Sequence, residues 1–176
     1  VVSRLLRIMG YSVYDTDSEA KRLMESSLEV VQKLSECFGR DIYHNGRLNR
    51  GLLSSRVFGE SDKIVLLNSI VHPVVRFDFY RWSESLNEEI CFVESAILYE
   101  SRFDELVDEV WTVTAPEELR IGRVRQRSGL TEEEIKKRMA AQLSEEEKQR
   151  RAAHIIWNDG NVSVIHRVLS LLKSLE

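Results

Sequence analysis

The sequence is poor in the residues that mark several large classes of protein. Its 176 residues include only two cysteines, two prolines and eight glycines. A collagen-like or disordered chain has far more glycine, proline or unbalanced charge, so we expect an ordinary folded protein. Cys37 and Cys91 form no CxxC pair, which argues against a disulfide framework or a thiolate zinc site and favours a cytoplasmic protein.

Long apolar runs and a strong net charge are missing as well. No run approaches the roughly 18 residues that a membrane-spanning helix requires, and no segment resembles a signal peptide. With 25 basic and 29 acidic residues, the formal net charge is −4. We therefore expect neither a membrane protein nor one that coats nucleic acid, although basic residues can still gather around a phosphate.

Short apolar runs alternate with helical patterns along the chain, which predicts a parallel sheet covered by helices on both faces. The pattern between residues 38 and 87 shows only helices and loops and predicts an inserted helical subdomain. Within it, Pro73 is expected to open a helix that ends near residue 86. One unbroken helix is expected from about residue 18 to Phe38. The runs with strand character are residues 12–14, 91–95, 109–114 and 154–158.

Two acidic residues, Asp15 and Asp17, directly follow the first of these strands. The carboxyl ends of parallel strands line the ligand crevice of an open α/β sheet, so acids there could bind a cation or orient a hydroxyl. The segment 15–18 is equally typical of a helix start, where a side-chain oxygen accepts backbone N–H groups. The two interpretations are compatible, because one acid can cap the helix while the other takes part in chemistry.

A series of arginines marks a second region of interest. Arg120, Arg123 and Arg127 are spaced so that they share one face of a helix. An arginine face suits a phosphate chain, because a guanidinium binds phosphate oxygens with two parallel hydrogen bonds. The alternative is a solvated, salt-bridged pair of helices, since acidic residues follow at 132–134 and 145–147.

Two further groups have weaker signals. His72 stands beside Pro73 at an expected helix start, where a histidine is typically packed or capping. Glu94 and Glu100 flank the loop after a strand, and loop acids are usually just solvated. Spacing alone does not distinguish a structural from a functional role for these residues.

Six short segments stand out along the chain. They are Asp15-Thr16-Asp17, His72-Pro73, Leu98-Tyr99-Glu100, Arg123-Val124-Arg125-Gln126-Arg127, Arg138-Met139-Ala140-Ala141-Gln142, and Ala153 through Asn158 with Gly160. Taken together, they resemble the dephospho-CoA kinase family and follow the order of its motifs from residue 1 to about residue 172. No single segment is specific, but six in register are.

The sequence departs from the family pattern at three places. Ala96 stands where the family usually has proline, and His154 where it usually has aspartate. The family's glycine-rich P-loop has no counterpart in these residues. We expect a strand and such a loop, ending in Lys-Ser or Lys-Thr, ahead of Val1, because that loop would cradle the phosphates.

The resemblance implies a P-loop kinase-type α/β fold, with a parallel sheet covered by helices on both faces, a helical substrate-binding insert and a helical lid. The implied activity is ATP-dependent phosphorylation, with Mg²⁺, of the ribose 3′-hydroxyl of dephospho-CoA, the last step of coenzyme A biosynthesis. We expect a cytoplasmic monomer or weak homo-oligomer that binds ATP and dephospho-CoA but neither nucleic acid nor membrane. The implied divisions are residues 1–37, 88–116 and 153–176 for the core, 38–87 for the insert and 117–152 for the lid.

The resemblance also implies roles for individual residues. Asp17 would be the catalytic residue that contacts the attacking hydroxyl, because the family motif places its functional acid second. No metal ligand is expected within these residues. Other small P-loop kinases, acting on nucleoside monophosphates or shikimate, and a nucleotide-binding module without catalysis are the alternatives. The residues expected at ATP and in the lid are Arg123, Arg127, Arg138, Asn158 and Gly160, and those expected at the substrate are His72, Glu100 and Asp15.

Overall fold

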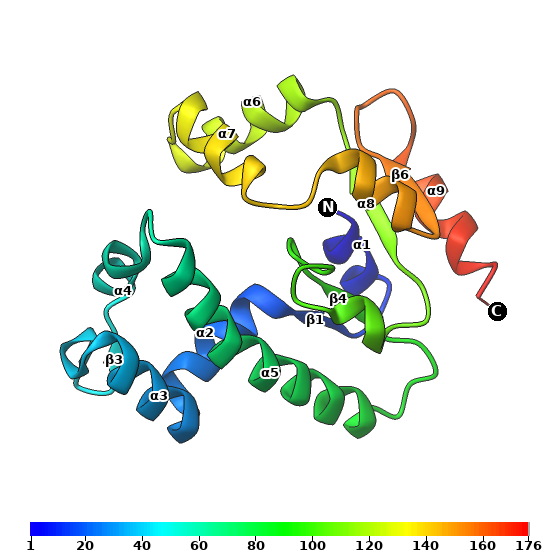
Figure 1. Cartoon of the computed structure of the whole chain (residues 1–176). Helices are drawn as coiled ribbons and strands as arrows, with labels where there is room; N and C mark the ends of the chain where they lie inside the picture. Colours follow the sequence, from blue (N-terminus) through cyan, green and yellow to red (C-terminus); the bar gives the residue numbers. More distant parts are fainter. Residues whose placement is uncertain (176) are drawn as a thin grey trace. The chain divides into compact units, whose positions relative to one another are not determined.

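A computed structural model describes residues 1–175, which form two compact units (Figure 1). One unit combines Val1–Gly10 with Ala96–Glu176, and the other is Tyr11–Ser95. Each unit contains a pair of parallel strands together with several helices. The mixed α/β class with parallel strands, predicted from the sequence, is therefore confirmed.

In the unit Tyr11–Ser95, strand β1 (Val13–Asp15) pairs in parallel with β4 (Phe92–Glu94). The register places Asp15 opposite Glu94, so the two strands end side by side. Directly after β1, the Thr16 hydroxyl donates a hydrogen bond of 3.0 Å to the Glu94 carbonyl. The end of β1, where the acidic motif begins, is thereby fixed to its neighbouring strand.

Two helices, α2 (Thr16–Ser26) and α3 (Leu28–Phe38), replace the single helix expected here. The expectation was wrong at Ser27, which is extended (φ −83°, ψ 114°) and whose hydroxyl accepts the Val30 N–H to start α3. Leu28, which helical spacing would place on the apolar stripe, is consequently 86% exposed.

A small antiparallel hairpin follows α3 and the short 3₁₀ turn η1 (Arg40–Ile42). Its strands are β2 (Tyr43–His44) and β3 (Arg47–Leu48), joined by Asn45-Gly46. Both turn residues have positive φ, 49° and 76°, as the tightest hairpin turns require. The expectation of only helices and loops between residues 38 and 87 is wrong at this point.

Helix α4 (Arg50–Val57) precedes α5 (Ser61–Ser85), which runs through Pro73 without interruption. The expectation that Pro73 opens a separate helix is wrong. A proline inside a helix costs about 3 kcal/mol, while each large apolar side chain that is buried contributes about 1.5–3 kcal/mol, so burial on both sides of Pro73 maintains the helix. The buried apolar residues of α5 are Ile70, Val71, Val75 and Phe79.

The other unit contains the second parallel pair, β5 (Trp111–Thr114) and β6 (His154–Trp157). Just after β6, the Asn158 N–H donates to the Thr114 carbonyl at 2.8 Å, which continues the ladder past the strand end. Besides these strands, the described part of this unit contains five helices and one 3₁₀ turn. They are α1 (Val2–Ile8), η2 (Phe103–Leu106), α6 (Glu117–Ser128), α7 (Glu132–Ala140), α8 (Glu145–Arg151) and α9 (Val164–Leu172).

Local sequence signals explain where α6 ends and where α7 begins. Gly129 ends α6 in the left-handed conformation (φ 68°), as its position in the sequence predicts. Thr131 and Glu134 form a reciprocal capping box at the start of α7. Within residues 1–175, no helix is long and apolar enough to cross a membrane.

Candidate active site

The two acids that follow β1 differ in what their carboxylates do. Asp15 is the N-cap of α2, and its Oδ1 accepts the backbone N–H groups of Asp17 (3.1 Å) and Ser18 (3.2 Å). Its Oδ2 accepts the Ser18 hydroxyl at 2.9 Å. The Asp17 side chain is exposed, and its carboxylate has no hydrogen bond or ion pair with the residues that the structure describes. Capping therefore belongs to Asp15, and the Asp17 carboxylate is available for a ligand.

Asp78 on α5 connects the elements that carry these acids. Its Oδ2 accepts the Tyr14 hydroxyl of β1 and the Arg22 guanidinium of α2, both at 2.7 Å. Tyr14 is only 4% exposed, and burial together with the Asp78 carboxylate raises the pKa of its phenol, so that it stays a proton donor. The end of β1, helix α2 and helix α5 are thus joined at one carboxylate.

We expect Asp78→Ala to lower the free energy of unfolding by about 1–3 kcal/mol, because the buried Tyr14 phenol loses its acceptor. The Val75 carbonyl, 3.5 Å away, would be the remaining partner of the phenol. Tyr14→Phe removes the donor instead of stranding it and should cost about 1 kcal/mol or less. Urea unfolding measures both values, and an equal or larger loss in Tyr14→Phe would contradict this role of Asp78.

His72 also lies on α5 and is half-buried. Burial lowers the pKa of its imidazole below the ordinary value of 6.5, and the positive charge of Arg76 lowers it further. His72 is therefore neutral near pH 7, where it can donate one hydrogen bond and accept another. Its substrate role stays a prediction.

The lowered pKa of His72 makes stability depend on pH in one direction. Below the ordinary pKa of 6.5, the unfolded chain binds a proton at His72 that the folded chain resists. The contribution of His72 to stability is therefore fully present above that pH and is lost as pH falls towards the folded-state pKa. We expect the urea unfolding free energy to fall less steeply below about pH 6.5 in His72→Gln than in the unchanged protein. Equal slopes would show that His72 titrates normally.

The arginines of α6 fall into different environments. Arg120 pairs with Glu145 (Nη1–Oε1 3.0 Å), and its Nε donates to the Ala115 carbonyl at 3.0 Å. The Nη1 of Arg123 donates to the Asn158 carbonyl at 2.7 Å. No hydrogen bond or ion pair engages Arg127 among residues 1–175. Of the three arginines on this face, Arg127 is the one with its whole guanidinium available.

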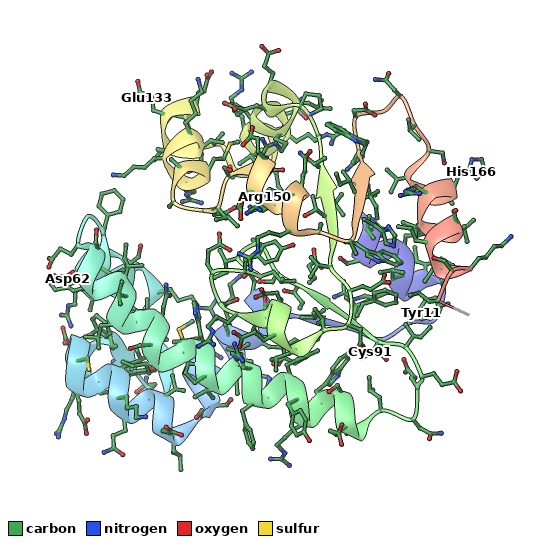
Figure 2. All side chains as sticks on the ribbon, turned by 45° about the vertical axis from the view of Figure 1, so that its right-hand side comes forward. Tyr11, Asp62, Cys91, Glu133, Arg150 and His166 are labelled. Atoms are coloured by element: carbon green, nitrogen blue, oxygen red, sulfur yellow. The ribbon has the colours of Figure 1, made fainter. Side chains whose placement is uncertain are left out.

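Two of the three acidic residues at the start of α7 have partners in the helix or at its N-cap. Glu132 pairs with Lys136 at 2.7 Å, and Glu134 accepts the N–H and the hydroxyl of Thr131 in the capping box. Figure 2 labels Glu133 at the exposed start of the same helix. The salt-bridged alternative therefore applies to Arg120, through α8, but not to Arg127.

The remaining expected residues all lie in the unit with α6. Arg138 is exposed in the last turn of α7. Asn158 has both backbone groups bonded, its N–H to Thr114 and its carbonyl to Arg123, and Gly160 lies two residues beyond in a turn with φ 92°. The Glu100 carboxylate accepts the N–H of Leu143 at 2.6 Å, so one of its oxygens holds the backbone after α7.

The structure thus gathers the expected residues into two groups, one in each unit. Asp15, Asp17 and His72 belong to Tyr11–Ser95, whereas the arginines, Asn158, Gly160 and Glu100 belong to the other unit. Sequence reasoning missed Asp78, whose contact with Tyr14 lies 64 positions away along the chain. It named residues 145–147 only as general salt-bridge partners and did not single out Glu145, whose contact with Thr114 lies 31 positions away. Neither residue belongs to a local motif, and only the pairing of charged residues with buried polar ones could have indicated them.

Comparisons with known proteins show which family the chain belongs to. The sequence model of the family "Dephospho-CoA kinase" matches residues 1–163. The dephospho-CoA kinase of Porphyromonas gingivalis is 36% identical over 176 residues, which cover 99% of this chain and 87% of that protein. The enzyme of the same name from Bacteroides fragilis is 38% identical, with 99% and 86% covered.

Two solved structures are similar as well. The crystal structure of TT1252 from Thermus thermophilus has a TM-score of 0.85 at 33% identity and covers 99% of this chain and 89% of that one. The dephospho-CoA kinase from Campylobacter jejuni, at 22% identity and a TM-score of 0.71 with 99% and 89% covered, shows the shared fold. By its sequence over nearly its whole length and by its fold, the chain belongs to the dephospho-CoA kinase family.

Proposed function

We propose that this protein transfers the γ-phosphoryl group of ATP to the ribose 3′-hydroxyl of dephospho-CoA and that Asp17 contacts the attacking hydroxyl. Membership of a kinase family gives the reaction class and the use of ATP. The observation that supports the choice of residue is the division of roles after β1. The Asp15 carboxylate accepts the backbone N–H groups that start α2. The Asp17 carboxylate next to it is exposed and unpaired among the described residues.

Asp17 would act mainly by holding the hydroxyl in place. Phosphoryl transfer passes through a loose transition state, in which little proton removal is needed before the new bond forms. A carboxylate, although a weak base towards an alcohol, can accept the hydroxyl hydrogen bond and aim the oxygen at phosphorus. The hydroxyl proton then passes to the Asp17 carboxylate as the new phosphate ester forms.

The lid arginines would neutralise the charge of the triphosphate. Arg127 has its full set of N–H donors to offer, and Arg123 has several left besides the one bound to Asn158. Arg138, exposed at the end of α7, would add a third positive charge. Preorganised cations of this kind act most strongly where charge develops in the transition state.

The other predicted residues have proposed places around the two substrates. By the family resemblance, Asn158 and Gly160 would lie near the adenine of ATP. The hydrogen bond from Arg123 to the Asn158 carbonyl holds their loop beside α6. His72, Asp15 and Glu100 would lie on the dephospho-CoA side. We also propose the division into a core (1–37, 88–116 and 153–176), a substrate insert (38–87) and a lid (117–152).

Mg²⁺ is proposed to arrive with ATP. No group of three His, Cys, Asp or Glu side chains within residues 1–175 could hold a metal ion, so these residues do not fit a dedicated metal site. Mg²⁺ commonly binds through substrate phosphates and water, and would shield the phosphate charge when bound. The proposed setting is a cytoplasmic monomer or weak homo-oligomer, which suits the exposed Cys37 thiol.

A turnover assay on the full-length protein tests the choice of acceptor. ADP release is measured with ATP and each of three acceptors at equal concentration, namely dephospho-CoA, AMP and shikimate. Dephospho-CoA should be used with a kcat/KM at least about a hundredfold above the other two. Turnover with AMP or shikimate at a comparable rate would assign the protein to another kind of small kinase.

A further inference from the structure

Glu145, the first residue of α8, connects three elements of its unit. Its Oε1 is 3.0 Å from the Arg120 guanidinium of α6, and its Oε2 accepts the hydroxyl of Thr114 at the end of β5 at 2.9 Å. Lys148, one turn along α8, lies 3.7 Å from the same carboxylate. The side chains of Glu145, Arg120 and Lys148 are 21%, 26% and 16% exposed, so solvent screens these charges only in part.

The Arg120–Glu145 pair lies at the base of the arginine face. Arg120 shares that face with Arg123 and Arg127, three and seven residues further along α6. The Nε of Arg120 also donates to the Ala115 carbonyl just before the helix. A helix is stiff over this distance, so the contacts that fix Arg120 also fix the direction in which the other two guanidinium groups project.

The far end of the α6–α7 pair is held close to the same carboxylate. Helices α6 and α7 pack side by side (Figure 1). After α7, the Gln142 side chain accepts a hydrogen bond from Lys148 at 3.3 Å, and the Leu143 N–H donates to Glu100 at 2.6 Å. The chain therefore enters the helix pair beside Arg120 and leaves it beside Lys148, and Glu145 contacts both residues.

We propose that Glu145 is a positioning residue of the lid, which aims Arg123 and Arg127 at the phosphates of ATP by holding Arg120 at the base of α6. This role rests on the function proposed above for the two arginines. Glu145 itself touches neither substrate nor reacting atoms.

The test compares Glu145→Ala and Glu145→Gln with Glu146→Ala, which removes the neighbouring exposed carboxylate from the same helical turn. We expect Glu145→Ala to raise the KM for ATP roughly tenfold and to leave the KM for dephospho-CoA within about twofold. Glu145→Gln keeps one acceptor oxygen, which can bond to Arg120 while the amide NH2 donates to the Thr114 hydroxyl oxygen, so it should recover part of the loss. Glu146→Ala should behave like the unchanged protein.

A second readout needs no turnover. Amide hydrogen exchange over residues 117–128, measured without substrates, should be faster in Glu145→Ala than in Glu146→Ala, because α6 has lost its anchor. Arg120→Ala should match Glu145→Ala, and the double variant should be no worse than either single one.

The measurements distinguish a failure of the positioning role of Glu145 from a failure of the proposed acceptor. Equal behaviour of Glu145→Ala and Glu146→Ala in KM and exchange would overturn the positioning role, as would a loss of kcat alone in proportion to unfolded protein. Faster exchange together with weaker ATP binding by calorimetry, in a protein that does not phosphorylate dephospho-CoA, would uphold the positioning role and overturn the proposed acceptor instead.

Discussion

Replacing Asp17 with asparagine is expected to lower kcat at least about a hundredfold, while the affinity for ATP changes little. Asparagine has nearly the same shape but loses the charge and the ability to take up the hydroxyl proton. The α2 cap is untouched, because Asp15 provides it and Asp17 contributes only its backbone N–H to that cap. The lost charge in the first turn of α2 should lower the unfolding free energy by no more than about 1 kcal/mol, so the large loss should appear in kcat with dephospho-CoA.

Asp15→Asn is the matched control for this substitution. Asparagine caps helices about as well as aspartate, so α2 should keep its start, and the effect on kcat should be much smaller. Single-turnover measurements at saturating ATP and dephospho-CoA separate the chemical step from binding. Near-normal turnover by Asp17→Asn would show that another group contacts the acceptor hydroxyl.

Replacing Arg127 with alanine is expected to lower kcat/KM about a hundredfold, the scale seen when one preorganised donor to developing charge is removed. The Arg127 guanidinium has no hydrogen bond or ion pair with the described part of the chain, so its removal leaves no buried partner unsatisfied. We expect the urea unfolding midpoint to stay the same, because such an exposed and unpaired side chain contributes little to folding.

Arg125→Ala removes the same charge from the same last turn of α6 but from a different face. Arg125 lies near Glu132 of α7, where its charge, after that of Lys136, helps to lower the pKa of that carboxyl. Its replacement should change kcat/KM by less than about threefold. Equal effects of the two substitutions would indicate general attraction of ATP to a basic lid and not a specific contact by Arg127.

Local signals made much of the fold predictable. The helix start at residues 15–18 occurs as expected, with Asp15 as the cap. The left-handed end at Gly129 and the capping box at Thr131 likewise depend on residues within a few positions. The apolar runs of β1, β4, β5 and β6 were likewise recognisable, because buried parallel strands are short and rich in large apolar residues.

The errors arose where tertiary packing outweighs local preference. Pro73 normally starts a helix, but burial on both sides of it keeps α5 continuous. Ser27 looks like an ordinary helix residue until its hydroxyl caps α3. For the candidate site, a motif can name Asp17 and Arg127, but it cannot show that Asp15 is occupied by capping or that Glu145 neutralises Arg120.

The position of the new phosphate is the most direct test of the proposed reaction. The full-length protein is incubated with ATP and either dephospho-CoA or its 3′-deoxyribose analogue, and the products are identified by mass spectrometry and ³¹P NMR. We predict one added phosphate on the ribose 3′-oxygen of dephospho-CoA, giving coenzyme A, and no phosphorylation of the 3′-deoxy compound. Phosphorylation of the analogue, or a phosphate at any other position of dephospho-CoA, would contradict the proposed function.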